Sequence, residues 1–253
     1  MIVGLSGLAG SGKDFIADLL VKNHGFVKVA LADPLKRICQ DVFDFSDEQL
    51  WGPSEKRNQP DKRYFTGRVK TGIVDYEDAR CLCYLDKAVK NDSSEPTEEE
   101  MLEYRKIYLT PRFALQFLGT EWGRNCYPQV WIDYTLRIAK KLLANDNHHY
   151  DPKHGLWQED LGWHQNSDHK PNGVVISDVR FANEMEAIRA EGGKVVRIIS
   201  DRATTLRGTA ALHASEREQQ EIPNSSFDYI LHNRTDLKSL ADELSKMLRD
   251  LSS

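Results

Sequence analysis

The glycine-rich segment Gly7-Leu8-Ala9-Gly10-Ser11-Gly12-Lys13-Asp14 constrains the fold of this chain more than any other feature. It matches the phosphate-binding P-loop pattern G-x-x-x-x-G-K-[ST] at every fixed position except the last, where an aspartate stands in place of the hydroxyl residue. An apolar run at residues 2–5 precedes the loop and predicts a buried parallel strand. Apolar side chains at 15/16 and 19/20 follow the loop with helical spacing. Strand, loop and helix in this order are the context that a nucleoside-triphosphate site requires.

The loop predicts how the phosphates of ATP would be held. Glycines let the backbone N–H groups turn inward around phosphate oxygens, and the N-terminus of the following helix adds partial positive charge. Lys13 would pair with the β and γ phosphates. The expected nucleotide-binding residues are Gly7, Ala9, Gly10, Ser11, Gly12, Lys13 and Asp14. The alternative is a glycine-rich turn between a strand and a helix that binds no ligand.

The aspartate at the last position of the motif predicts a dependence on a divalent metal. In the common motif a hydroxyl ligates Mg²⁺, and the Asp14 carboxylate could do so directly or through a water, because Mg²⁺ prefers oxygen ligands and keeps several waters. Without a cation, Asp14 would repel the phosphates.

The bulk properties of the chain exclude several classes of protein. A formal net charge of −5 and a pI near 5.9 argue against a broad electrostatic grip on nucleic acid. None of the four cysteines forms a C-x-x-C pair, which favours reduced thiols in a cytoplasmic protein. No signal peptide precedes the first strand, and no apolar run approaches membrane-spanning length, so no membrane partner is expected.

The order of expected elements indicates an α/β fold in which helices cover both faces of a parallel sheet. Further strands are expected at 27–31, 174–177, 195–199 and 227–231, and further helices from Asp33, from Thr110 to Leu118, and at 129–144, 182–191 and 236–251. We expect one P-loop domain of this α/β class over 1–253, with polar insertions at about 52–108 and 145–172. Ligands in such a sheet gather at the carboxyl ends of the strands.

Four charged residues follow strand ends and are candidates for catalysis. Asp178 directly follows a buried apolar strand, where an acidic residue can hold Mg²⁺ through water, and Arg180 could contact a phosphate. The alternative is that Asp178 caps the next helix and Arg180 lies on the surface. Arg202 and Arg207 follow the strand at 195–199 and could close over the transferring phosphoryl group, although a capping box nearby favours a structural role for this stretch. The sequence leaves open which of these two arginines is catalytic.

A second group of polar residues could bind the phosphoryl acceptor. Lys36 follows the second strand, with an ordinary exposed helix lysine as the alternative. Arg112, Gln116 and Gly119/Thr120 share one helix face, where the arginine suits a phosphate and the amide or hydroxyl suits a base edge. A polar outer face of the helix would give the same pattern.

The second insertion is rich in histidine, with five of the eight histidines of the chain between residues 148 and 169. A zinc site needs a defined spacing of histidines or cysteines, which this stretch lacks, so we expect no metal site there.

The chain resembles bacteriophage deoxynucleoside monophosphate kinases in a series of motifs that run in order over most of its length. They are Ser11–Asp14, Asp33-Pro34-Leu35-Lys36, Leu50-Trp51-Gly52, Thr110–Arg124 with its Leu-Gly-Thr-Glu run, Trp131, Val175–Glu184, His213-x-Ser215-Glu216 and Phe227–Ile230. Animal-type phosphomevalonate kinase is more distantly similar, since it shares an SGKD-type loop but lacks the Leu-Gln-x-Leu-Gly-Thr-Glu run.

The resemblance implies ATP-dependent phosphorylation of deoxynucleoside monophosphates to diphosphates for phage DNA precursor synthesis, with a broad choice of bases, by a homodimer in the host cytoplasm. Matching positions place the acceptor around Lys36, Arg112, Gln116, Gly119, Thr120 and Trp131. Mg²⁺ would be held by Asp14 and, through water, by Asp178. Three alternatives stay open: a phosphomevalonate-type kinase, a kinase of a modified base in DNA, and an ATP-binding module without turnover.

Overall fold

The computed structural model describes residues 1–8, 10–64, 83–84, 87–88, 92–98, 100, 108–144, 148–158, 170–200, 219, 221–233 and 237–252. The chain divides into two compact units, the first formed by Met1–Pro34 with Gly123–Ser253 and the second by Leu35–Trp122. The second unit is larger than the insertion expected at 52–108. Ala9, Arg202, Arg207 and the His213–Glu216 motif lie outside the described residues.

The first unit is built on a five-stranded sheet with the strand order β2-β5-β1-β6-β7. The strands are β1 (Ile2–Ser6), β2 (Phe26–Val29), β5 (Gly173–Val179), β6 (Lys194–Ile199) and β7 (Tyr229–His232). Every neighbouring pair runs parallel, with Val3 opposite both Val175 and Lys194. The expected parallel sheet is therefore confirmed.

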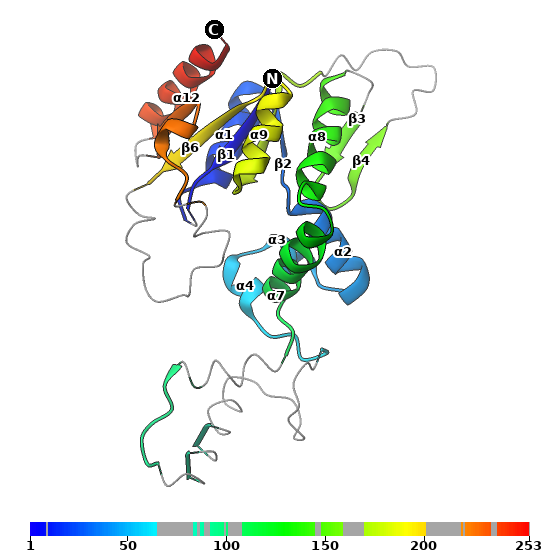
Figure 1. The fold of residues 1–253 in the computed structure, drawn as a ribbon, viewed down its shortest axis with the longest axis vertical. Coiled ribbons are helices and arrows are strands. Elements are labelled where there is room, and N and C mark those ends of the chain that lie inside the picture. Colours follow the sequence, from blue (N-terminus) through cyan, green and yellow to red (C-terminus); the bar gives the residue numbers. More distant parts are fainter. Residues whose placement is uncertain are drawn as a thin grey trace. The chain divides into compact units, whose positions relative to one another are not determined.

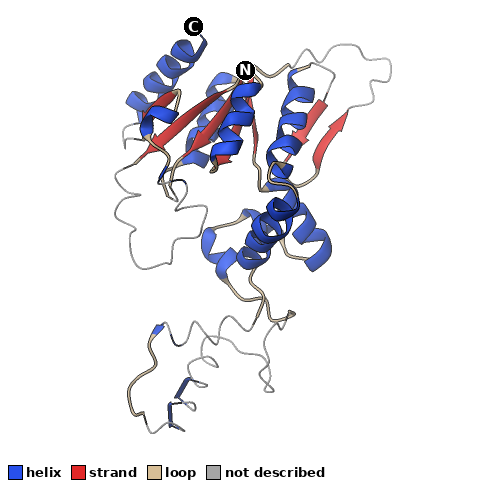
Figure 2. Ribbon diagram, in the orientation of Figure 1, coloured by secondary structure: helices blue, strands red, loops and turns tan. Residues whose placement is uncertain are grey.

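Helices flank this sheet on both faces (Figures 1 and 2). They are α1 (Lys13–His24), α8 (Val130–Leu143), α9 (Ala182–Ala190) and α12 (Leu237–Ser252). Val3 and Leu5 belong to a buried cluster with α1 and α12. Gly4 points to the opposite face because side chains alternate along a strand, and a Cβ there would lie 2.7 Å from Ile188 Cδ1 of α9. One face thus packs on α1 and α12, and the other on α9.

The second unit is helical. Its elements are α2 (Asp33–Phe43, beginning in the first unit), α3 (Asp47–Trp51), α4 (Ser54–Asn58), α7 (Pro111–Gln116) and the π-helix η1 (Phe117–Arg124, ending in the first unit). Its core contains Cys39, Phe45, Leu50 and Ala114. The expected cap at Thr110 is confirmed, since Thr110 Oγ1 accepts the Phe113 N–H at 3.1 Å and Pro111 follows as the first helical residue. The α-helix expected to reach Leu118 instead changes to a π-helix at Phe117.

The polar insertion expected at 145–172 contains a hairpin of two antiparallel strands, β3 (His148–Asp151) and β4 (Gly155–Gln158). A short 3₁₀-helix, η2 (Asn224–Ser226), precedes β7. Within the described parts of the chain, no helix has the length and apolar character needed to cross a bilayer.

Candidate functional site

The P-loop has a backbone that favours glycine at three positions. Gly7, Gly10 and Gly12 have φ values of 156°, 78° and 88°. A Cβ at Gly7 would lie 2.5 Å from the Ile198 carbonyl oxygen, and a Cβ at Gly12 would overlap the side-chain amide of Asn233. The loop is therefore closely packed against the ends of β6 and β7, as a rigid phosphate cradle requires.

Lys13 is the first residue of α1 and reaches back over the loop. Its Nζ donates to the carbonyl oxygens of Gly7 at 2.5 Å and Leu8 at 2.9 Å. Ser11 Oγ is buried and has no hydrogen-bond partner within the described residues. An ammonium group, a buried hydroxyl donor and a helix N-terminus thus converge on one loop, and this set of donors fits the phosphates of a nucleotide.

Asn233 holds the loop from the end of β7, and sequence reasoning missed it. Its side-chain amide donates to the Ser11 carbonyl oxygen at 2.9 Å, and its own N–H donates to the Ile199 carbonyl oxygen at 2.7 Å. The signal available was its position directly after the last strand, at the edge of the sheet where ligands gather.

Asp14 lies beside the loop in a largely exposed position, paired with Lys28 of β2. The Lys28 Nζ is 3.0 Å from Asp14 Oδ1 and 3.1 Å from Asp18 Oδ1, and the Asp14 side chain is 81% exposed. Burial lowers the pKa of Lys28, but the two carboxylates outweigh it and hold the pKa above its ordinary value. Asp14 is therefore accessible to a cation while it forms an ion pair with Lys28. No cluster of three metal-ligating side chains occurs among the residues that the structure describes.

Asp178 lies near the end of β5, as expected, and its carboxylate contacts the turn between β2 and α2. Its Oδ1 accepts the Leu31 N–H at 2.7 Å and its Oδ2 accepts the Ala32 N–H at 3.1 Å. The helix that follows β5 is capped by a different carboxylate, because Glu184 Oε2 accepts the N–H groups of Arg180 at 2.7 Å and Phe181 at 3.0 Å. Each Asp178 oxygen retains a lone pair that a metal-bound water could use.

The buried Glu184 pairs with the partly buried Arg124 next to Arg180. Arg124 Nη1 lies 3.3 Å from Glu184 Oε1, and its guanidinium lies 3.5 Å from the centroid of the Phe181 ring. Burial raises the pKa of Glu184 to about 7. The hydrogen bonds from the backbone N–H groups and the charge of Arg124 lower this pKa, but burial outweighs them. The side chain of Arg180 is exposed, so this cation is accessible to an anionic ligand.

The second unit brings several of the expected acceptor residues onto neighbouring helices. Lys36 Nζ of α2 lies 5.7 Å from the centroid of the Trp51 ring. Arg112 of α7 donates through Nη2 to Ser54 Oγ of α4 at 2.6 Å. Gly119, in η1, lies against α2, since a Cβ there would be 3.2 Å from Leu35 Cδ1. Gln116 ends α7 and Thr120 follows in η1, whereas Trp131 is buried on α8 of the first unit.

The π-helix η1 is itself informative about function. It covers Phe117–Arg124 and so contains the whole Leu-Gly-Thr-Glu run. Runs of π-helix are rare and occur often at functional sites, because the wider hydrogen-bond register displaces side chains from their α-helical positions. The unusual geometry therefore coincides with residues expected to bind the acceptor.

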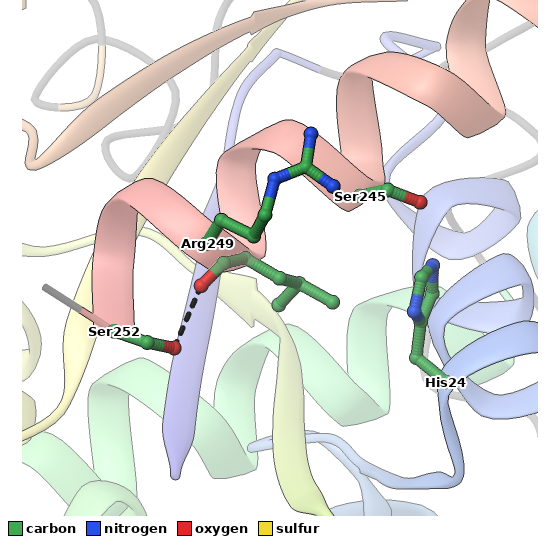
Figure 3. A pocket seen from close by; sticks show the side chains of 5 residues that line it. His24, Ser245, Arg249 and Ser252 are labelled. Carbon is green, nitrogen blue, oxygen red and sulfur yellow. Dashed lines mark hydrogen bonds between the residues drawn. The ribbon is translucent and has the colours of Figure 1, made fainter.

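A surface cavity of about 610 Å³ lies elsewhere, lined by His24, Ser245, Leu248, Arg249 and Ser252 (Figure 3). Ser252 Oγ donates to the Leu248 carbonyl oxygen at 2.7 Å in its wall. His24 is the last residue of α1, and the P-loop meets the first, so a helix of roughly 18 Å separates them. This cavity therefore lies at the end of α1 opposite to the P-loop.

Comparison with known proteins identifies the family. No protein-family model matches the chain. A deoxynucleotide monophosphate kinase of Acanthamoeba polyphaga mimivirus is 30% identical over 246 residues, covering 96% of this chain and 94% of that protein. The chain belongs to the deoxynucleoside monophosphate kinase family. The deoxynucleoside-5'-monophosphate kinase of Escherichia phage T5 is 25% identical over 209 residues, covering 75% of this chain and 72% of that protein. The motif-based resemblance is thus confirmed.

Two solved structures are more remotely similar. A sugar kinase from a Janibacter species is 12% identical, covering 98% of this chain and 94% of that chain, with a TM-score of 0.38. Dephospho-CoA kinase from Campylobacter jejuni is 14% identical, covering 99% of this chain and 96% of that chain, with a TM-score of 0.37.

Proposed function

We propose that this family member transfers the γ-phosphoryl group of ATP to a deoxynucleoside monophosphate, releasing a deoxynucleoside diphosphate and ADP. The observation that carries the proposal is a P-loop with its lysine in place, in a chain matched over 96% of its length to a kinase named for this acceptor. The match spans both units, so it includes the loop for the donor and the helices expected to bind the acceptor.

The reaction needs positioning more than proton transfer. An oxygen of the acceptor phosphate attacks the γ-phosphorus, the new P–O bond forms, and the bond to the β,γ-bridging oxygen breaks so that ADP leaves. The attacking oxygen is already anionic near pH 7, so no strong general base is required. Holding the two anions in line and neutralising their charge then supplies the rate.

Lys13 is the central cation of this account. Its ammonium group donates to two loop carbonyl oxygens, and these bonds hold it where β and γ phosphate oxygens would be cradled. Exchange of a carbonyl for a phosphate oxygen strengthens the bond, because both partners are then charged. Arg180 supplies a second cation at the end of β5, and Arg202 or Arg207 would supply a third.

Asp14 and Asp178 are the carboxylates that would hold a magnesium ion beside the phosphates. When bound, Mg²⁺ neutralises charge on the transferring phosphates. Asp14 would hold it directly or through water, in exchange for part of its contact with Lys28, and Asp178 would hold it through water while keeping its bonds to the turn at 31–32.

The acceptor is assigned to the residues around α2, α7 and η1. Lys36 and Arg112 would pair with its phosphate, and Gln116, Gly119, Thr120 and Trp131 would contact its sugar and base. In support, Lys36 lies over the Trp51 ring and Arg112 lies beside Ser54. The proposal includes a homodimer working in the cytoplasm, without stable binding to nucleic acid.

An acceptor panel tests this function against its rivals. ADP release is measured with the four deoxynucleoside monophosphates, phosphomevalonate and a DNA duplex as alternative acceptors. We expect release to depend on a deoxynucleoside monophosphate. Turnover with phosphomevalonate or DNA alone would assign the protein to another kinase class, and ATP binding without transfer to any acceptor would make it a non-catalytic module.

A further inference from the structure

The β3–β4 hairpin is an addition to the fold to which the proposed reaction assigns no role. The side chain of Asp151 closes its turn by accepting the N–H groups of Lys153 at 2.8 Å and His154 at 3.0 Å. Across the two strands, the His149 ring stacks on Trp157 with centroids 5.6 Å apart. A hairpin held in this way can place a side chain accurately.

Tyr150, in β3, contacts the first residue of α2. Its hydroxyl donates to Asp33 Oδ2 at 2.8 Å, across 117 residues of sequence. Asp33 is the first residue of α2 and is only 3% exposed. A buried carboxylate needs donors to offset its desolvation, and the tyrosine hydroxyl is one of them.

Asp33 belongs to a turn whose backbone donors are all bound. Asp33 Oδ2 also accepts the Ala30 N–H at 2.9 Å, and the Asp33 N–H donates to the Ala30 carbonyl oxygen at 3.1 Å. The N–H groups of the two residues between them, Leu31 and Ala32, donate to Asp178. The hairpin and the end of β5 therefore hold the same four residues, from which α2 begins.

We propose that Tyr150 is a positioning residue for the acceptor, acting through Asp33 on the first turn of α2. Lys36 lies three residues after Asp33, one helical turn further along α2. A change in how the Asp33 carboxylate is held alters the start of this helix and so the placement of Lys36. The inference rests on the proposed function, because it requires α2 to bind the acceptor.

The test is the variant Tyr150→Phe, which removes the hydroxyl and keeps the ring. We expect the KM for the deoxynucleoside monophosphate to rise about tenfold, as for the loss of one hydrogen bond to a charged group. The KM for ATP and kcat should change by less than about twofold, because Tyr150→Phe leaves the bonds from the Leu31 and Ala32 N–H groups to Asp178 in place. The matched control is Tyr127→Phe, which removes a similar bond from Tyr127 to Asp133 Oδ2, 2.6 Å long and exposed.

A second measurement separates positioning from general stability. Hydrogen exchange of the amides of residues 30–33 should be faster in Tyr150→Phe than in the wild type. In a double variant, adding Tyr150→Phe to Asp33→Asn should raise the acceptor KM no further than Asp33→Asn alone. An unchanged acceptor KM, or an equal rise in both KM values, would overturn the inference. If wild-type protein phosphorylates no deoxynucleoside monophosphate, the proposed function fails; if it does and Tyr150→Phe is unaffected, only this inference fails.

Discussion

Lys13 is the residue on which the proposed phosphate site depends most directly. Its Nζ lies on the carbonyl oxygens of Gly7 and Leu8, at the N-terminus of α1. We expect Lys13→Ala to lower kcat by about 10²- to 10³-fold, the usual effect of removing one preorganised donor to developing charge. Lys22→Ala is the control, since Lys22 is an exposed residue of the same helix. Steady-state kinetics measure kcat, and thermal unfolding checks that the variant is folded. Near-normal turnover in folded Lys13→Ala protein would refute the mechanism.

Asp14 should determine how the enzyme responds to Mg²⁺. A threonine in its place restores the common motif but removes one negative ligand, so Asp14→Thr should stay active and require several-fold more Mg²⁺ for half-maximal rate. Asp18→Thr is the matched control, because Asp18 shares the contact with Lys28 at 3.1 Å but lies outside the loop motif. A magnesium titration of both variants checks this. Full activity of the wild type in excess chelator would contradict the cation argument.

At the scale of the elements, a substitution in η1 distinguishes a role of Gly119 in binding the acceptor from a role in packing. Gly119 is buried in it without a positive φ, and an added Cβ would come within 3.2 Å of the flexible end of Leu35. Alanine favours a helix over glycine by about 1 kcal/mol, which offsets the close contact with Leu35. The free energy of unfolding of Gly119→Ala should therefore lie within about 1 kcal/mol of the wild-type value. We expect its KM for the acceptor to rise about tenfold with the KM for ATP unchanged. An unchanged acceptor KM would remove Gly119 from the site.

The first turn of α9 should make stability depend on pH. The pKa of Glu184 is raised from its ordinary 4.5 to about 7, chiefly by burial. The folded protein therefore binds this proton more tightly than the unfolded chain. The resulting stability is fully present below pH 4.5 and is lost as the pH rises through 7, by about 3 kcal/mol in the free energy of unfolding.

Glu184→Gln carries no titrating group and should lack this decline. Urea unfolding of wild type and variant between pH 4.5 and 8 measures the difference, with Glu186→Gln, an exposed change on the same helix, as the control. Identical pH slopes in the wild type and Glu184→Gln would show that Arg124 keeps the buried carboxylate charged throughout.

The elements also show what the sequence could and could not predict. The P-loop and the parallel sheet were predictable, because apolar periodicity and turn residues act over a few positions. The hairpin was missed because β3 reads His-His-Tyr-Asp, without apolar alternation. The change from α- to π-helix at Phe117 was missed because a shift in hydrogen-bond register leaves no clear mark on the spacing of side chains.

In the molecule as a whole, the side chains that tie the site together join distant parts of the sequence. Asn233 and Ser11 are 222 residues apart, Asp178 and Leu31 are 147 apart, and Tyr150 and Asp33 are 117 apart. The sequence placed Asp178 correctly at a strand end, but its partners could not be inferred, because they depend on which loops the finished sheet brings together. Local patterns thus predicted the P-loop, its flanking strand and helix, and the position of Asp178, and the three-dimensional structure supplied the contacts between them.

Direct transfer of label tests the central claim of the account. Wild-type protein with γ-labelled ATP, Mg²⁺ and one deoxynucleoside monophosphate should yield labelled deoxynucleoside diphosphate in equal amount to the ADP released. Lys13→Ala protein under the same conditions should yield about a hundredth or less of that label. Two results would contradict the account: label recovered only as inorganic phosphate, or label that stays in ATP whichever deoxynucleoside monophosphate is supplied.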